Sequence, residues 1–296
     1  QRWYGGDLGL QARMAFTMFL LVALYLFFIG AMFASGVNNF TILLIAAVLL
    51  GAQYFFSDRL VLAASGAREV TPAEAPELHE MVDRLAQQAD LPKPKVAMIN
   101  TMTPNAFATG RSPSAAAVAV TTGLLETLDR REVEAVLAHE LTHVKNRDMA
   151  VMTIASFFAT VAQFVMRMGF FGGFGYGRRR REDNFFMAYI ASLLVWIISF
   201  FLIRALSRYR EFAADRGAAL LTGSPSTLAS ALIKISGTMQ RIPSRDLREA
   251  EAMNAFFIIP TNVGQSLAEL FSTHPSLEKR LAYLERLQQE MEAAPA

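Results

Sequence analysis

Four long runs without a charged residue most constrain the fold of this 296-residue chain. They cover residues 14–34, 36–56, 149–166 and 185–203. A helix needs about 20 apolar residues, and at least about 17, to span the ~30 Å hydrocarbon layer of a bilayer. The sequence therefore predicts four transmembrane helices in two hairpins. No small-residue cleavage site follows the first run, so we interpret it as a retained helix rather than a signal peptide.

The polar segments between these runs divide the chain into four parts. Residues 1–57 and 149–206 form the two membrane hairpins, and residues 58–148 and 207–296 form the two parts of a water-exposed domain. With 53% hydrophobic and 18% charged residues, the chain is too apolar for an ordinary soluble domain and too polar for burial in lipid throughout. The expected fold class is an α+β integral membrane protein, mostly helical with a small sheet.

Helices are expected through most of the water-exposed domain. An amphipathic helix over residues 75–91 has one apolar face, made by Leu78, Met81, Val82, Leu85 and Ala89. Asp129 and Glu132 have the spacing of a capping box, which predicts a helix start at residue 130. Further helices are predicted over residues 204–221, 225–240 and 245–256 and from Pro275, with a linker over residues 259–264.

Short apolar stretches bounded by Pro, Gly or Ser predict the strands of the small sheet, at residues 94–100 and 114–123. Between them, residues 103–111 contain Pro, Asn and Gly close together, which is typical of a hairpin connection. The glycine- and arginine-rich segment 169–183 is expected to be a mobile loop.

Charges beside the apolar runs predict their orientation. Arg2 and Arg13 precede the first run, and Arg59 and Arg68 follow the second, so the positive-inside rule places the water-exposed domain in the cytoplasm. The loop of the second hairpin carries Arg167, the run Arg178 to Arg181 and two acidic residues, a net of five minus two, or +3. A positive loop of this kind opposes export across the membrane. The second hairpin is therefore either an exception to the positive-inside rule or does not cross the membrane fully.

Composition excludes several classes of site. The chain has no cysteine, which rules out disulfides, iron–sulfur clusters, thiolate zinc sites and a cysteine nucleophile. Any metal must be bound by His, Asp or Glu. The net charge of +2 comes without a basic stripe interleaved with aromatic residues, so no nucleic-acid partner is expected.

The segment His139-Glu140-Leu141-Thr142-His143 carries the expected chemistry. Residues four apart lie on one helical face, so both imidazoles can bind one zinc ion while Glu140 reaches the metal-bound water as general base. The alternative is a solvated helix face without a metal.

A catalytic zinc site needs a third protein ligand. In the three-histidine arrangement, a Gly and a His follow the second His after three and six residues, but Asn146 and Met149 stand there. In the glutamate arrangement the ligand comes from a later E-x-x-x-D segment, which Glu211 and Asp215 provide. Asp215 then lies one turn beyond Glu211, where it can accept the outer N–H of a ligand histidine.

Four segments resemble the corresponding blocks of the HtpX membrane zinc metalloproteases, a family related to the CAAX prenyl proteases: AHELTHVKNRD, SRYREFAADRGAA, PNAFATGR and FSTHPSLEKRL. They occur in the family's order over nearly the whole chain. The resemblance implies a zincin-like (gluzincin) core and one Zn²⁺ held by His139, His143 and Glu211. It also implies proteolysis of misfolded membrane proteins at the cytoplasmic face of the bacterial inner membrane, as stress-linked quality control.

Two further residues are candidates for the site. His274 precedes a helix that begins with proline, and the resemblance makes it a candidate for stabilising the oxyanion. Asn105 is a candidate substrate contact, since zincin substrates pair with a sheet edge, here residues 115–121 or the Asn105 segment. Arg178 to Arg181 are interpreted as a solvated charge run and His79 as a surface residue.

Other functions remain as alternatives. An intramembrane site-two-type protease carries its motif inside an apolar span, whereas this helix begins at Asp129-Arg130-Arg131. A CAAX prenyl protease would need more than four spans. A catalytically inactive, zinc-stabilised membrane scaffold or partner-binding protein has no use for Glu140, and loss of activity in a Glu140 variant would distinguish it from an enzyme.

Overall fold

The computed structural model describes residues 7–34, 61–172, 179–241 and 273–293, with isolated positions between 44 and 55. The second apolar run, the helix expected over residues 245–256 and the linker at 259–264 therefore lie outside the described residues, or almost entirely so.

A four-stranded sheet has the order β1-β2-β4-β3. The strand β2 (Lys95–Ile99) pairs in parallel with β4 (Ala117–Thr121), and the short β1 (Arg68–Glu69) pairs with β2 in antiparallel register. The fourth strand, β3 (Ala106–Thr109), pairs antiparallel to β4 and ends the sheet. Both predicted strands are confirmed.

The segment expected to connect these strands is itself a strand. Residues 103–111 contain β3, so β4 has a strand on each side, and every residue of β4 is buried. Of the two segments considered for the sheet edge, the one beside Asn105 ends the sheet as β3, and residues 115–121 lie inside the sheet. The start of that segment is also not extended, because Pro113–Ala115 form a short 3₁₀ helix, η1.

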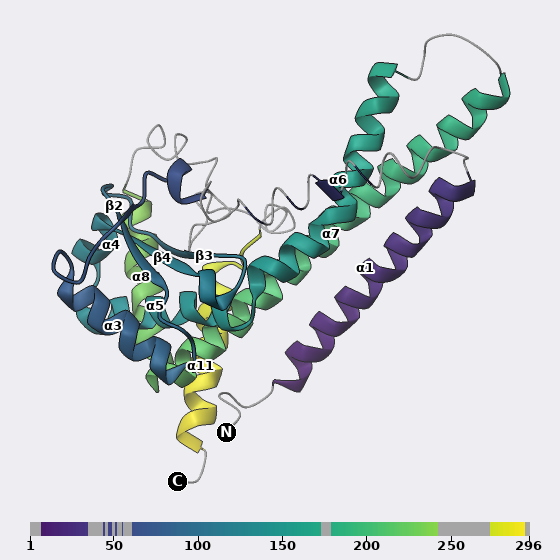
Figure 1. The fold of residues 1–296 in the computed structure, drawn as a ribbon. Helices are drawn as coiled ribbons and strands as arrows, with labels where there is room; N and C mark the ends of the chain where they lie inside the picture. Colours follow the sequence, from purple (N-terminus) through teal and green to yellow (C-terminus); the bar gives the residue numbers. More distant parts are fainter. Residues whose placement is uncertain are drawn as a thin grey trace.

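Helices cover the sheet and surround α5 (Arg130–Lys145). They are α3 (Pro76–Gln88), α4 (Thr122–Thr127), α8 (Pro225–Met239) and α11 (Leu277–Ala293), seen together at the left and bottom of Figure 1. The predicted apolar face of α3 is buried, and the capping box of Asp129 and Glu132 is formed in both directions. Because α5 lies inside the core, the side chains it bears are held rigidly.

Three described helices are long and apolar enough to cross a membrane. They are α1 (Leu8–Ala34), α6 (Asp148–Gly172) and α7 (Arg179–Thr222), and they extend together away from the sheet (Figure 1). Leu21 and Phe28 of α1 pack with Val161 of α6 and Val195 of α7, while other large apolar side chains of these helices are exposed. Such a surface fits contact with lipid tails.

The helix α7 is longer than the sequence analysis suggested. It runs for 44 residues without a break, so the fourth apolar run and the segment 204–221 form one element, and the expected domain boundary at residues 206/207 falls inside it. Helical backbone at Gly172 and Arg179 also shows that the expected mobile loop, 169–183, is helical at both ends. The helix α11 begins at Leu277, two residues after Pro275.

Candidate metal centre

The helix α5 presents His139, Glu140 and His143 on its last two turns. His139 is 1% exposed and Glu140 is 6% exposed, whereas the side chain of His143 is 19% exposed. The Nε2 atoms of the two histidines lie 3.2 Å apart, as expected for side chains one helical turn apart that face the same point. The centre is therefore buried at His139 and open to solvent at His143.

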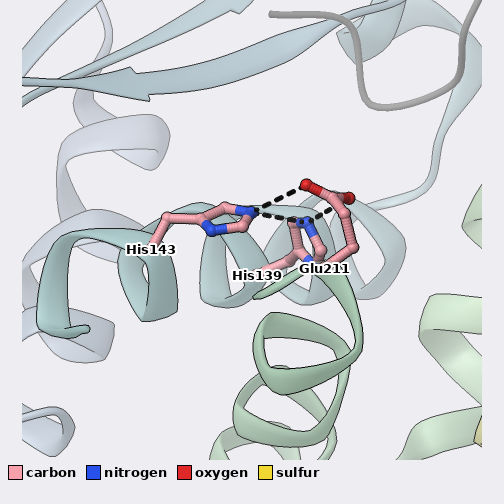
Figure 2. Close-up of side chains that lie close together, drawn as sticks. All are labelled: His139, His143 and Glu211. Carbon is pink, nitrogen blue, oxygen red and sulfur yellow. Dashed lines mark hydrogen bonds and ion pairs between the residues drawn. The ribbon is translucent and has the colours of Figure 1, made fainter. Parts of the chain in front are cut away.

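The third candidate ligand comes from α7, 68 residues after His143 (211 minus 143). Glu211 Oε1 lies 3.5 Å from His143 Nε2, and Glu211 Oε2 lies 3.7 Å from His139 Nε2. Figure 2 shows the three side chains converging from two helices. One ligand atom from each lies within 4.8 Å of the others, which identifies the group as a possible metal site.

These separations fit a single zinc ion. Ligand atoms about 2.0–2.1 Å from a tetrahedral zinc lie about 3.3 Å from one another. The two Nε2 atoms lie 3.2 Å apart, and each carboxylate oxygen of Glu211 lies near one imidazole, at 3.5 and 3.7 Å, so all three separations are close to that value. Three protein ligands leave the fourth position open, as in catalytic zinc sites.

The outer ring nitrogens of both histidines are held by carboxylates. His139 Nδ1 lies 3.0 Å from Asp215 Oδ1, as the E-x-x-x-D spacing predicts, and His143 Nδ1 lies 2.6 Å from Asp148 Oδ2. An N–H donated from Nδ1 leaves the lone pair on Nε2, toward the shared point. Asp215 and Asp148 thus fix the histidine tautomer that a metal requires.

Two arginines hold these carboxylates in turn. Arg280 of α11 donates from Nε and Nη2 to Asp215, at 2.9 and 2.5 Å, and its Nη1 lies 3.6 Å from Glu211 Oε2. Arg210 of α7 forms an ion pair with Asp148. Each histidine therefore ends a chain of arginine, aspartate and imidazole.

Three residues of the site, Asp148, Arg210 and Arg280, were not predicted from the sequence. Arg280 has a recognisable signal, because it occupies an apolar position in the helical pattern Leu277, Arg280, Leu284, Leu287 and is 2% exposed. The role of Asp148 is harder to predict from the sequence. The direction of its side chain depends on the turn between α5 and α6, where Arg147 has a φ of 55°.

A glycine allows α7 to approach α5. A Cβ placed on Gly217 would lie 2.4 Å from Cγ2 and 2.6 Å from Oγ1 of Thr142, which is fully buried on α5. Gly217 lies on the same part of α7 as Glu211 and Asp215. The close crossing of α5 and α7 therefore depends on glycine at position 217, which has no side chain. This crossing brings Glu211 to the two histidines.

Glu140 contacts the edge strand. Its Oε2 accepts a hydrogen bond of 2.9 Å from the backbone N–H of Ala108 in β3. Burial raises the pKa of the Glu140 carboxyl, and the neighbouring imidazoles of His139 and His143 act in the opposite direction. A raised pKa brings a carboxylate nearer to the range in which it exchanges protons at neutral pH.

The structure places the weaker candidates differently. His274 is 7% exposed and its Nδ1 lies 3.2 Å from Glu211 Oε2, so it belongs to the same cluster. Asn105, at the start of β3, is 4% exposed, and its backbone N–H and C=O both bond to Thr121. His79 is only partly exposed, because its Nε2 lies 2.9 Å from the carbonyl oxygen of Val70, so its interpretation as a surface residue was wrong in part.

Comparison with known proteins identifies relatives over the whole chain. A model of peptidase family M48 matches residues 72–288. The Protease HtpX homolog of Moorella thermoacetica is 65% identical over 295 residues, which cover 99% of each chain. The Protease HtpX homolog 2 of Methanosarcina acetivorans is 58% identical over 292 residues, covering 98% of this chain and 99% of the relative.

A solved structure shares the fold. The crystal structure of S. mikatae Ste24p superposes with a TM-score of 0.56 at 18% identity, over 94% of this chain and 67% of the other. At that identity the likeness concerns the fold alone. The family match and the full-length relatives decide the assignment: the chain belongs to peptidase family M48, and it is a membrane-bound metalloendopeptidase similar along its whole length to the HtpX proteases.

Proposed function

We propose that the metal is zinc, bound by His139, His143 and Glu211, and that Glu140 is the general base of peptide hydrolysis. The observation that carries this proposal is the convergence of two imidazole nitrogens and the Glu211 carboxylate, at separations close to those in a tetrahedral zinc site. Buried aspartates on both outer histidine nitrogens support it, because they favour neutral imidazoles with their lone pairs on Nε2.

The chain's own side chains would handle the proton and the developing charge. Zinc, when bound, acidifies a water molecule to a pKa of about 7 and polarises the substrate carbonyl. Glu140 then takes the water's proton and delivers it to the leaving nitrogen. His274, within 3.2 Å of Glu211, is our candidate for stabilising the oxyanion, and Asp215 keeps His139 in the required tautomer.

The substrate would bind in extended form along β3. This strand ends the sheet and its Ala108 contacts Glu140, so a peptide added at that edge would pass beside the ligands. The partly exposed His143 marks the open side of the centre. In this arrangement Asn105 would act at the start of β3, positioning the strand that receives the substrate.

We further propose that the enzyme crosses the bacterial inner membrane four times, with its centre in the cytoplasm, and degrades misfolded membrane proteins. The positive charges beside the first hairpin support the orientation. The single helix α7, which joins a membrane span to Glu211, supports cleavage close to the membrane surface, within reach of membrane-protein and unfolded substrates.

Glu140→Gln tests the catalytic role. The amide keeps the size of the side chain but cannot accept a proton, so we expect casein cleavage and self-cleavage to fall by about 10²–10⁴-fold. Zinc content per chain, measured on detergent-purified protein, should not change.

Glu126→Gln is the matched control, because Glu126 is an exposed residue of α4, and it should retain full activity. Unchanged cleavage in Glu140→Gln would refute the assigned base. Bound zinc without cleavage in the wild type as well would favour the catalytically inactive scaffold.

A further inference from the structure

A second cavity lies on the side of α7 that faces away from the metal centre. Its volume is about 740 Å³, and it is lined by the start of α1, the last third of α7 and α11. Glu211 and Asp215 of α7 face the metal centre, whereas Phe212 and Arg216 face this cavity. The proposed catalytic chemistry uses none of its lining residues.

The lining combines apolar side chains with an excess of positive charge. Phe212, Tyr283 and Leu287 supply apolar surface. The ionisable side chains in the lining are four cations, Arg13, Arg216, Lys279 and Arg286, and two carboxylates, Asp7 and Glu290. The net charge of these side chains is four minus two, or +2, which favours an anionic ligand.

Both carboxylates already have partners. Glu290 Oε2 lies 3.5 Å from Arg216 Nη1. Asp7 accepts hydrogen bonds from the backbone N–H of Leu10, at 2.9 Å, and from Tyr283 Oη, at 3.2 Å. Among the residues that the structure describes, Arg13 and Arg286 have no carboxylate within ion-pair distance, and Arg286 lies instead 5.6 Å from the ring centre of Tyr283.

The cavity adjoins the residues that precede the first apolar run. Arg13 directly precedes the apolar run 14–34 of α1. The lining residues Leu8, Gly9, Leu10 and Arg13 span five residue steps, about 8 Å of helix. The headgroup layer on each side of a bilayer is about 5–8 Å thick. Leu8, which is 79% exposed, stands at the same level.

We propose that this cavity binds the phosphate group of an anionic phospholipid, with Arg13 and Arg286 as its main contacts. Guanidinium groups suit phosphate because they donate parallel N–H bonds to two of its oxygens. The apolar lining would contact the start of an acyl chain of the lipid. A bound headgroup would contact α1, α7 and α11. Two of these helices also contribute to the metal centre, α7 through Asp215 and α11 through Arg280.

Binding to the full-length protein, purified and delipidated in a neutral detergent, tests the proposal without any measurement of proteolysis. Phosphatidylglycerol and phosphatidylcholine with identical acyl chains are titrated and followed by native mass spectrometry, and inorganic phosphate is titrated separately at constant ionic strength. We expect phosphatidylglycerol to bind at least about tenfold more tightly than phosphatidylcholine, a difference of about 1.4 kcal/mol.

The double variant Arg13→Gln/Arg286→Gln should lose this preference. Its matched control, Arg68→Gln/Arg131→Gln, removes two exposed arginines of the water-exposed domain and should keep it. Equal zinc content in both variants shows that they are folded, and the single variants should each lose part of the preference.

The phosphate titration distinguishes the source of the ligand. Inorganic phosphate that binds with the same dependence on Arg13 and Arg286, without any lipid preference, would support the phosphate site and assign it a soluble ligand. Equal affinity for both lipids together with no phosphate binding would overturn the proposal, as would a preference that the double variant retains.

Discussion

Each candidate ligand histidine is held by its own aspartate, and the two aspartates differ in origin. Asp215 is fully buried on α7 and receives two N–H bonds from Arg280. Asp148 is the first residue of the membrane helix α6 and pairs with Arg210, the neighbour of Glu211. The position of His143 therefore depends directly on where the second apolar hairpin begins.

Asp148→Asn should weaken zinc binding without removing a ligand. The amide is a poorer acceptor for the His143 Nδ1–H and leaves Arg210 without its ion pair, so we expect about 10–100-fold lower zinc affinity. Competition with a metallochromic chelator measures the change. Asp83→Asn, at a partly exposed position of α3, is the control and should bind zinc as the wild type does. Equal affinity in the two variants would show that Asp148 has no role in positioning His143.

At the scale of elements, the centre is made by the crossing of α5 and α7. The first helix is fixed in the core by its capping box and its buried apolar residues. The second passes it at the distance that Gly217 and Thr142 allow. Since two ligands lie on one helix and the third on the other, a small change in this crossing moves Glu211 relative to both imidazoles.

Gly217→Ala tests that crossing. In an exposed helix, replacing Gly by Ala is stabilising by about 1 kcal/mol, but here the new methyl group meets Thr142 at 2.4 Å. We therefore expect a net loss of about 1–3 kcal/mol and weaker zinc binding. Thermal unfolding in detergent with and without added zinc measures both effects.

Gly237→Ala is the matched control. Gly237 is also helical, in α8, but a Cβ there meets nothing within 4 Å, so this variant should be as stable as the wild type or more so. Equal effects of the two substitutions would exclude a steric role for Gly217.

For the whole molecule, the metal centre requires that the start of α6 and the end of α7 lie on the same side of the membrane. His143 precedes α6 and Glu211 lies near the end of α7, so the chain must leave the centre and return to it. The 25 residues of α6 extend about 37 Å, enough to cross a hydrocarbon layer. The second hairpin therefore either crosses the membrane and returns or stays on one side throughout.

Single cysteines separate these two possibilities, because the natural chain has none. A cysteine at residue 175, between α6 and α7, should react with an impermeant maleimide in intact spheroplasts, since four spans place it outside. A cysteine in place of the partly exposed Lys93 should react only after lysis. Protection of residue 175 until lysis would contradict four complete spans.

The sequence by itself determined the features that depend on local periodicity. Helical spacing placed His139, Glu140 and His143 on one face, predicted the buried side of α3, and marked three of the four expected spans as helices that the structure describes. Such features follow from the backbone geometry of a single helix, which neighbouring residues fix. The pairing of Glu211 with the histidines was also anticipated, but only by matching its spacing to a known zinc arrangement.

Only the tertiary structure decided which distant groups meet. The edge position of β3, the contact of Asp148 with His143 and the burial of Arg280 against Asp215 depend on how separate elements pack. The uninterrupted α7 likewise joins a membrane span to the metal centre, where the sequence suggested two separate segments. Side-chain directions at helix ends and strand order in a sheet are set by long-range packing, so no local pattern contains them.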